Sequence, residues 1–158
     1  MTDSNERKRE YLLRYLRAIH RVNRAELDLR QTSAIGPSAI IYDDMPHGSP
    51  DLNGLERIAI QADKQLADLN RAEADAARIH DEILRVIESL GVDSQINVMF
   101  YRYVYYEQTQ SERTNNLRGT RQLSWSEIAD RLSYSLDRVA HIHGEALARL
   151  EIPQVDRQ

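Results

Sequence analysis

A repeat of apolar residues, spaced alternately by three and four, is the feature that most constrains this chain. Its only polar member is Gln65, and it comprises Leu55, Ile58, Ala62, Gln65, Leu69, Ala72, Ala76, Ile79, Ile83, Val86 and Leu90. A repeat sustained over five heptads is typical of a coiled-coil seam rather than of a globular helix face. It predicts a rod of about 54 Å, with Gly91 as its C-cap. The alanines of the seam permit the close approach of a partner helix.

A second helix is predicted N-terminal to this seam, over about residues 4–31. One stripe of it is mostly apolar, and arginines lie mostly off the stripe, at Arg14, Arg17, Arg21 and Arg24. These arginines form either a solvated face or a phosphate-binding face. Residues 32–54 hold six glycines and prolines and predict a long loop, with a short extended piece allowed at 39–42. We therefore expect an N-terminal domain over residues 1–91, in which two helices form an antiparallel hairpin.

The two helices of this hairpin differ in length, because the seam is longer than the N-terminal helix. Part of the seam, toward Leu90, must therefore meet another partner, for which a second copy of the chain is a candidate. We expect a homo-oligomer, a dimer or higher, formed through the long helices.

Composition narrows the class of protein. The chain has 158 residues, no cysteine and a formal net charge of -4. It has no secretory signal pattern and no apolar run of the roughly 18 residues that cross a bilayer, so we expect a cytoplasmic protein without membrane contact. The acidity is concentrated in residues 36–95, which carry twelve Asp/Glu against five Lys/Arg, whereas residues 96–158 carry eight of each. This balance permits DNA binding, but the sequence shows no strongly basic segment of the kind that dominates many DNA-binding surfaces.

A third helix is expected to begin at a cap formed by Asp93 or Ser94. We expect the tyrosines at the end of this helix to pack mainly in the core and at interfaces. The stretch from 108 to 122 is polar and predicts a flexible insertion. Its arginines, Arg113, Arg118 and Arg121, either meet phosphates or are simply solvated.

The end of the chain has the layout of two short helices joined by a turn. Ser124 and Glu127 form an S-x-x-E capping box, Ser133 and Tyr134 make the turn, and Ser135 caps the second helix. Apolar residues occupy one stripe of that helix: Val139, Ile142, Ala146 and Leu150, with Leu147 beside it. This is the arrangement of a helix-turn-helix, whose second helix enters the major groove of DNA. We assign this module to residues 92–152.

Two histidines in the second helix, His141 and His143, raise the alternative of a metal site. Residues two apart lie about 200° apart around a helix, so both side chains cannot hold one ion. His143 is expected to face the core and His141 the solvent, where Glu145 is within reach. We find no phosphate-binding glycine loop and no nucleophile elbow, and predict no enzyme, no metal and no cofactor.

The spacing in the C-terminal module resembles the promoter-binding region of bacterial sigma factors, and more closely the phage late transcriptional regulators of the RinA/ArpU type. The resemblance rests on segments 98–104, 125–132 and 135–150, and on Met45-Pro46-His47-Gly48-Ser49 in the long loop. It covers nearly the whole chain, except that the insertion at 108–122 is longer than the family implies. The resemblance implies an all-α fold and a DNA-binding regulator that works with RNA polymerase.

Carried over by position, the resemblance implies that Leu136, Asp137 and His141 meet base edges, while Ser133, Tyr134, Ser135 and Arg138 meet phosphates. Arg121, in the basic insertion, is a further candidate for phosphate contact. No arginine occupies the three base-reading positions, so binding to double-stranded DNA is expected to be weak without dimerisation or polymerase. The alternative is a structural or adaptor protein, such as an oligomeric helical protein of the small-terminase kind used in DNA packaging.

Overall fold

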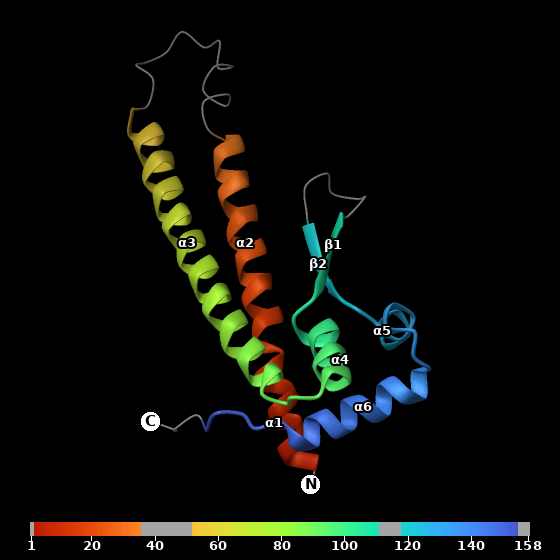
Figure 1. Ribbon diagram of the computed structural model, residues 1–158. Helices are drawn as coiled ribbons and strands as arrows, with labels where there is room; N and C mark the ends of the chain where they lie inside the picture. The colour runs from red at the N-terminus through yellow and green to blue at the C-terminus, as the bar shows by residue number, and fades with distance from the viewer. Residues whose placement is uncertain (1, 36–51, 111–117, 155–158) are drawn as a thin grey trace.

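The computed structural model describes residues 2–35, 52–110 and 118–154, and most of these residues are helical (Figure 1). The helices are α1 (Thr2–Leu12), α2 (Arg14–Ile35), α3 (Leu52–Glu88), α4 (Asp93–Tyr103), α5 (Trp125–Leu132) and α6 (Leu136–Arg149). Two short strands, β1 (Tyr106–Gln110) and β2 (Arg118–Gln122), are the exception. The expected all-α class is thus confirmed in its coarse form, as a mostly helical chain.

The two longest helices, α2 and α3, run antiparallel side by side (Figure 1). Arg14 of α2 pairs with Glu82 of α3 at 3.2 Å, and the ring centroids of Tyr15 and His80 lie 5.1 Å apart. The seam of α3 faces this contact, and its members from residue 55 to residue 72 are only half-buried. The N-terminal helix predicted over 4–31 is longer than expected and is interrupted at Leu13.

The C-terminal end of α3 is covered by other helices of the same chain, whereas a second copy had been a candidate partner for this end. Ile83 and Ile87 are fully buried, and Leu90 is nearly so. They share one core with residues of α1, α4 and α6, among them Leu12, Met99, Tyr103, Leu147 and Leu150. This end of the seam thus has the additional partner that was expected, but that partner is supplied by α1, α4 and α6 of the same chain.

A turn at Gly91 makes this gathering of helices possible. Gly91 has φ 70°, a left-handed conformation that favours glycine, and the next helix, α4, begins two residues later. The side-chain cap expected from Asp93 or Ser94 is not formed: the N-cap residue is Val92. Asp93 lies instead in the first turn of α4, where a carboxylate stabilises the helix dipole. The predicted boundary between the two domains falls at this turn.

The two strands correct the prediction of a flexible insertion at its two described ends, residues 108–110 and 118–122. β1 and β2 pair antiparallel, with Glu107 opposite Arg121 and Gln108 opposite Thr120. The sheet is also tied to α2, because the side-chain amide of Asn23 donates to the Thr120 hydroxyl at 2.7 Å. Backbone pairing and these side-chain contacts order the two described ends of an insertion that is too polar to form a core of its own.

Several predictions lie outside the described residues. They concern most of the long loop, including the extended piece at 39–42 and the segment 45–49, and the central part of the insertion. Both ends of the predicted loop 32–54 are helical instead, because α2 continues to Ile35 and α3 already begins at Leu52. Among the described helices, none is long and apolar enough to cross a membrane.

Candidate nucleic-acid interface

The N-terminus of α5 is capped as predicted. The Ser124 hydroxyl accepts a hydrogen bond from the Glu127 backbone N–H at 3.3 Å, and the Glu127 carboxylate accepts from the Ser124 backbone N–H at 2.7 Å. Both halves of the capping box are therefore present. The box satisfies two backbone N–H groups that the first turn of a helix leaves without partners, and it defines where α5 begins.

The turn between α5 and α6 is built from three polar or aromatic residues. Ser133 adopts a left-handed conformation with φ 56° and ψ 40°. The Tyr134 N–H donates to the carbonyl of Ala129 at 2.9 Å, which closes the end of α5. Ser135 then caps α6, because its hydroxyl accepts from the Arg138 N–H at 3.2 Å. The predicted turn and the predicted cap are both confirmed.

A small apolar core holds α5 and α6 together. Ile128 and Val139 are fully buried where the two helices meet, and Val98 of α4 and Leu123 join them from outside the pair. The expected stripe of α6 is buried throughout: Val139, Ile142, Ala146, Leu147 and Leu150. Because the inner face of α6 is fully used by this packing, the opposite face is presented to solvent.

The outer face of α6 carries the residues expected to read bases. Leu136 is 52% exposed, and Asp137 and His141 are exposed beside it. At 100° per residue, Ala140 and Gly144 lie between these side chains, and both are exposed. The side chains at the centre of this face are therefore small, so another molecule could approach the backbone of α6 closely.

The residues expected to contact phosphates fall into two places. Seven of the eight predicted site residues lie in the turn and the first two turns of α6. In this group, the Arg138 guanidinium lies 4.1 Å from the centroid of the Tyr134 ring, which holds the cation at the edge of the turn. Arg121 is separate from this group, because it lies on β2 beside the start of α5.

Carboxylates surround the Arg121 guanidinium. It donates two hydrogen bonds to Glu127, both at 2.8 Å, and one to Glu107 at 2.8 Å. Arg131 donates to the second oxygen of Glu107 at 2.6 Å. Hydrogen bonds from Arg121 and from the backbone of Ser124 lower the pKa of Glu127 to about 2. Arg121 is therefore already neutralised by protein groups, and a phosphate would have to compete with two carboxylates for it.

The two histidines of α6 point in different directions, as predicted. His141 is exposed, and its Nε2 lies 3.1 Å from Glu145. His143 is buried, and its Nε2 lies 2.9 Å from the Tyr103 hydroxyl. The His143 ring also meets the Trp125 ring edge-on, at 4.6 Å between centroids. Burial, followed by the charges of Arg9 and Arg102, lowers the pKa of His143 to about 4.

His143 is accordingly a neutral core residue rather than a metal ligand. In the part of the chain that the structure describes, no three His, Asp or Glu side chains lie close enough together to bind a metal ion.

Sequence reasoning missed the pairing of Arg121 and Arg131 with Glu107 and Glu127. One signal was present: Glu107 and Arg121 lie at either end of the polar insertion, at symmetric positions for a hairpin. Opposite charges at paired positions of two strands attract each other across the ladder.

Compared with known proteins, the chain matches no family model, no curated protein and no solved structure.

Proposed function

We propose that this chain is a sequence-specific DNA-binding transcriptional regulator of phage or prophage origin, in which α5 and α6 form a helix-turn-helix. The observation that carries the proposal is the outer face of α6, which follows a capped turn and is exposed along its length. A helix of this kind fits the major groove of B-DNA, which is about 12 Å wide. The α2–α3 pair would serve as the hairpin that oligomerises or contacts RNA polymerase.

Each exposed side chain of this face has a role in the proposal. Leu136 contacts a thymine methyl group, Asp137 accepts from cytosine N4, and His141 donates to guanine. Arg138 contacts a phosphate, helped by the hydroxyls of Ser133 and Ser135 and by Tyr134. The small residues Ala140 and Gly144, between the reading residues, allow the helix to lie deep in the groove.

Electrostatics make this binding weak for a single chain. The outer face of α6 has one arginine, Arg138, against the carboxylates of Asp137 and Glu145. Since Arg121 and Arg131 pair with Glu107 and Glu127, they add little positive potential. Binding would release few counterions, so its affinity should depend only modestly on salt concentration. Dimerisation or RNA polymerase would have to supply the remaining affinity.

Selection of sequences from a random DNA pool by the purified chain tests the proposal, followed by fluorescence anisotropy with the selected duplex at several salt concentrations. Arg138→Gln should reduce the slope of log K against log salt by about 0.9, the value for one phosphate contact. His141→Ala should relax the preference at one base pair. Arg71→Gln is the matched control, because Arg71 is exposed on α3 beside Asp68. Absence of any enriched sequence and of salt-sensitive binding would refute the proposal.

Oligomerisation through α3 is part of the proposal. Ile60 is 63% exposed and Leu66 is 47% exposed on the half of α3 that lies away from α6. The side-chain oxygen of Gln65 is buried there, without a hydrogen-bond partner among the described residues. A second hairpin packed on this half of α3 would cover the two apolar side chains.

A second candidate function is a structural or DNA-packaging protein in which α6 docks on another helix. The small residues on the outer face of α6, together with the exposed Leu136, favour it, since they suit close helix packing. The mass of the particle in solution distinguishes the two functions. A ring of eight or more subunits would support packaging, whereas a monomer or dimer would support regulation.

A further inference from the structure

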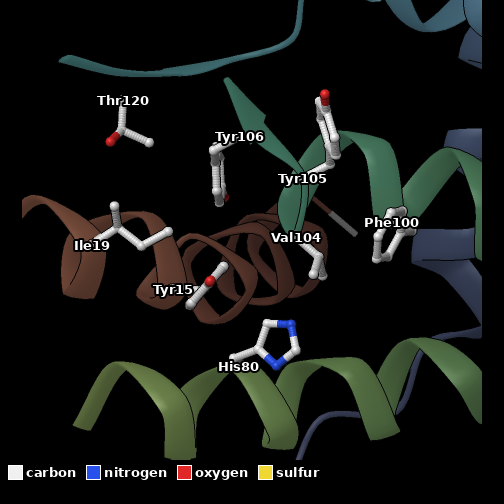
Figure 2. A pocket seen from close by; sticks show the side chains of 8 residues that line it. All are labelled: Tyr15, Ile19, His80, Phe100, Val104, Tyr105, Tyr106 and Thr120. Carbon is white, nitrogen blue, oxygen red and sulfur yellow. The ribbon is translucent and has the colours of Figure 1, made fainter. Parts of the chain in front are cut away.

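A cavity of about 280 Å³ lies where α2, α3, α4 and the two strands meet, away from the outer face of α6. Figure 2 shows that aromatic side chains from different elements converge on it. Its walls include Tyr15 of α2, His80 of α3, Phe100 of α4, and Tyr105 and Tyr106 at the start of β1. The volume is just below the range for small-molecule sites, about 300–1,000 Å³, so it would hold a molecule of one or two rings.

Three of the rings that line the cavity form an edge-on and tilted cluster, with interplanar angles of 63° between Tyr15 and His80 and 44° between Tyr15 and Tyr106. Tyr15 lies between His80 and Tyr106, with ring centroids 5.1 Å and 5.7 Å away, as is visible in Figure 2. The Tyr106 hydroxyl is held by the carbonyl of Tyr103 at 2.7 Å. Aromatic rings in such arrangements attract a further flat ring through edge-to-face or offset contacts. The cavity therefore favours a planar aromatic ligand.

His80 determines which polar group the ligand should carry. Its Nδ1 lies 3.2 Å from the carboxylate of Asp81, so Nδ1 carries the hydrogen and donates it. In the neutral imidazole this leaves Nε2 as an acceptor. Figure 2 shows the second ring nitrogen of His80 on the side that faces the cavity, and no described residue makes a hydrogen bond to it. A ligand at this nitrogen should donate an O–H or N–H.

The charges around the cavity disfavour ligands that carry a carboxylate or a phosphate group. No lysine or arginine lines the cavity, and the charged group beside His80 Nδ1 is the carboxylate of Asp81, at 3.2 Å. A carboxylate or phosphate on the ligand would be desolvated there without a cationic partner, which is unfavourable.

We propose that this cavity is a binding site for a small, uncharged aromatic molecule that donates one ring N–H or O–H, of the indole or phenol type, to His80. The site is independent of the function proposed for α6.

The test uses the full chain and four probes: indole, 1-methylindole, phenol and benzoate. Binding is followed by NMR, through the ring signals of His80 and Tyr15, as each probe is added. Indole and phenol should bind saturably, with dissociation constants on the order of 0.1–1 mM for ligands of this size. 1-Methylindole lacks the donor and should bind about five- to tenfold more weakly, the loss expected for one hydrogen bond. Benzoate should cause no saturable shift.

Two variants locate the binding. His80→Phe keeps an aromatic ring beside Tyr15 but removes the Nε2 acceptor. Indole and 1-methylindole should then bind equally. His141→Phe is the matched control, since His141 is 75% exposed on α6 and pairs only with Glu145 among the described residues; it should preserve the preference for indole. If His80→Phe fails to fold, the comparison of indole with 1-methylindole on the unaltered chain still decides the matter. Equal binding of those two probes, saturable binding of benzoate, or no shift of the His80 and Tyr15 signals would overturn the proposal.

Discussion

Acid should destabilise this protein through one buried histidine, His143. The imidazole is 6% exposed, and its Nε2 is within hydrogen-bond distance of the Tyr103 hydroxyl. Burial keeps that tyrosine protonated by raising its pKa, so the hydroxyl donates and the neutral Nε2 accepts. Protonation of His143 would remove this acceptor and place a charge in an apolar site near Arg9 and Arg102, which are cationic themselves.

The magnitude follows from the difference between the two states of the chain. The pKa of His143 is about 4 in the folded protein, against the ordinary value of 6.5. Because the folded-state pKa is depressed, the stabilisation is fully present above pH 6.5 and is lost progressively as the pH falls to 4. At about 1.4 kcal/mol per pH unit, the free energy of unfolding should fall by about 3 kcal/mol over this window through His143 alone. Glu127, whose pKa is lowered from 4.5 to about 2, adds a loss of its own only at the acid end of this window, as the pH approaches and passes 4.5, and that loss is shared by every variant that keeps Glu127.

Urea unfolding followed by circular dichroism, at half-unit steps from pH 7 to pH 4, measures this loss. The comparison is with His143→Gln, which has no titratable ring: its unfolding free energy should fall less steeply than that of the unaltered chain, by about 3 kcal/mol over the window. His141→Gln is the control and should follow the unaltered chain, because His141 is exposed. The quantity compared is the slope of the unfolding free energy against pH, not the absolute stability of the variant. Should the two lines for the unaltered chain and His143→Gln run parallel, the assignment of a neutral core histidine is wrong. If His143→Gln does not fold, an NMR titration of the His143 ring must give a pKa near 4.

Three further changes probe the helices of the C-terminal module by chemical denaturation. Gly144→Ala should raise the free energy of unfolding by about 0.5–1 kcal/mol, since a Cβ at this helical position meets nothing within 4 Å; a loss of stability would show that the outer face of α6 is covered. Ser124→Ala should lower it by about 1 kcal/mol, because the capping box is broken; Ser126→Ala, at an exposed neighbour, should leave it nearly unchanged. Ile128→Ala should cost about 2–5 kcal/mol, since Ile128 is fully buried, whereas Leu136→Ala on the exposed face should cost under about 0.5 kcal/mol. Equal costs at Ile128 and Leu136 would contradict the assignment of the inner and outer faces.

The local features of this chain could be predicted because they depend on residues close in sequence. The 3–4 spacing from Leu55 to Leu90 predicted one long helix, and α3 extends over nearly that range. The capping box at Ser124, the cap at Ser135 and the opposite directions of His141 and His143 were also predicted correctly. Each of these depends on contacts or angles within a few residues, which helical geometry determines.

The tertiary structure decided what distant segments do to one another. Arg121 stands among arginines in a polar stretch, and it is neutralised by its pairing with Glu127 on α5 and with Glu107 on the opposite strand, fourteen residues away. Likewise, Lys8 donates to the carbonyl of Leu147 at 2.7 Å, and the cavity beside His80 draws its walls from five elements. The sequence by itself determined where α5 and α6 begin, which face of α6 is buried and which histidine is internal. Contacts between segments that are far apart depend on loop closure and on the combined packing of many side chains, and no local pattern of residues encodes them.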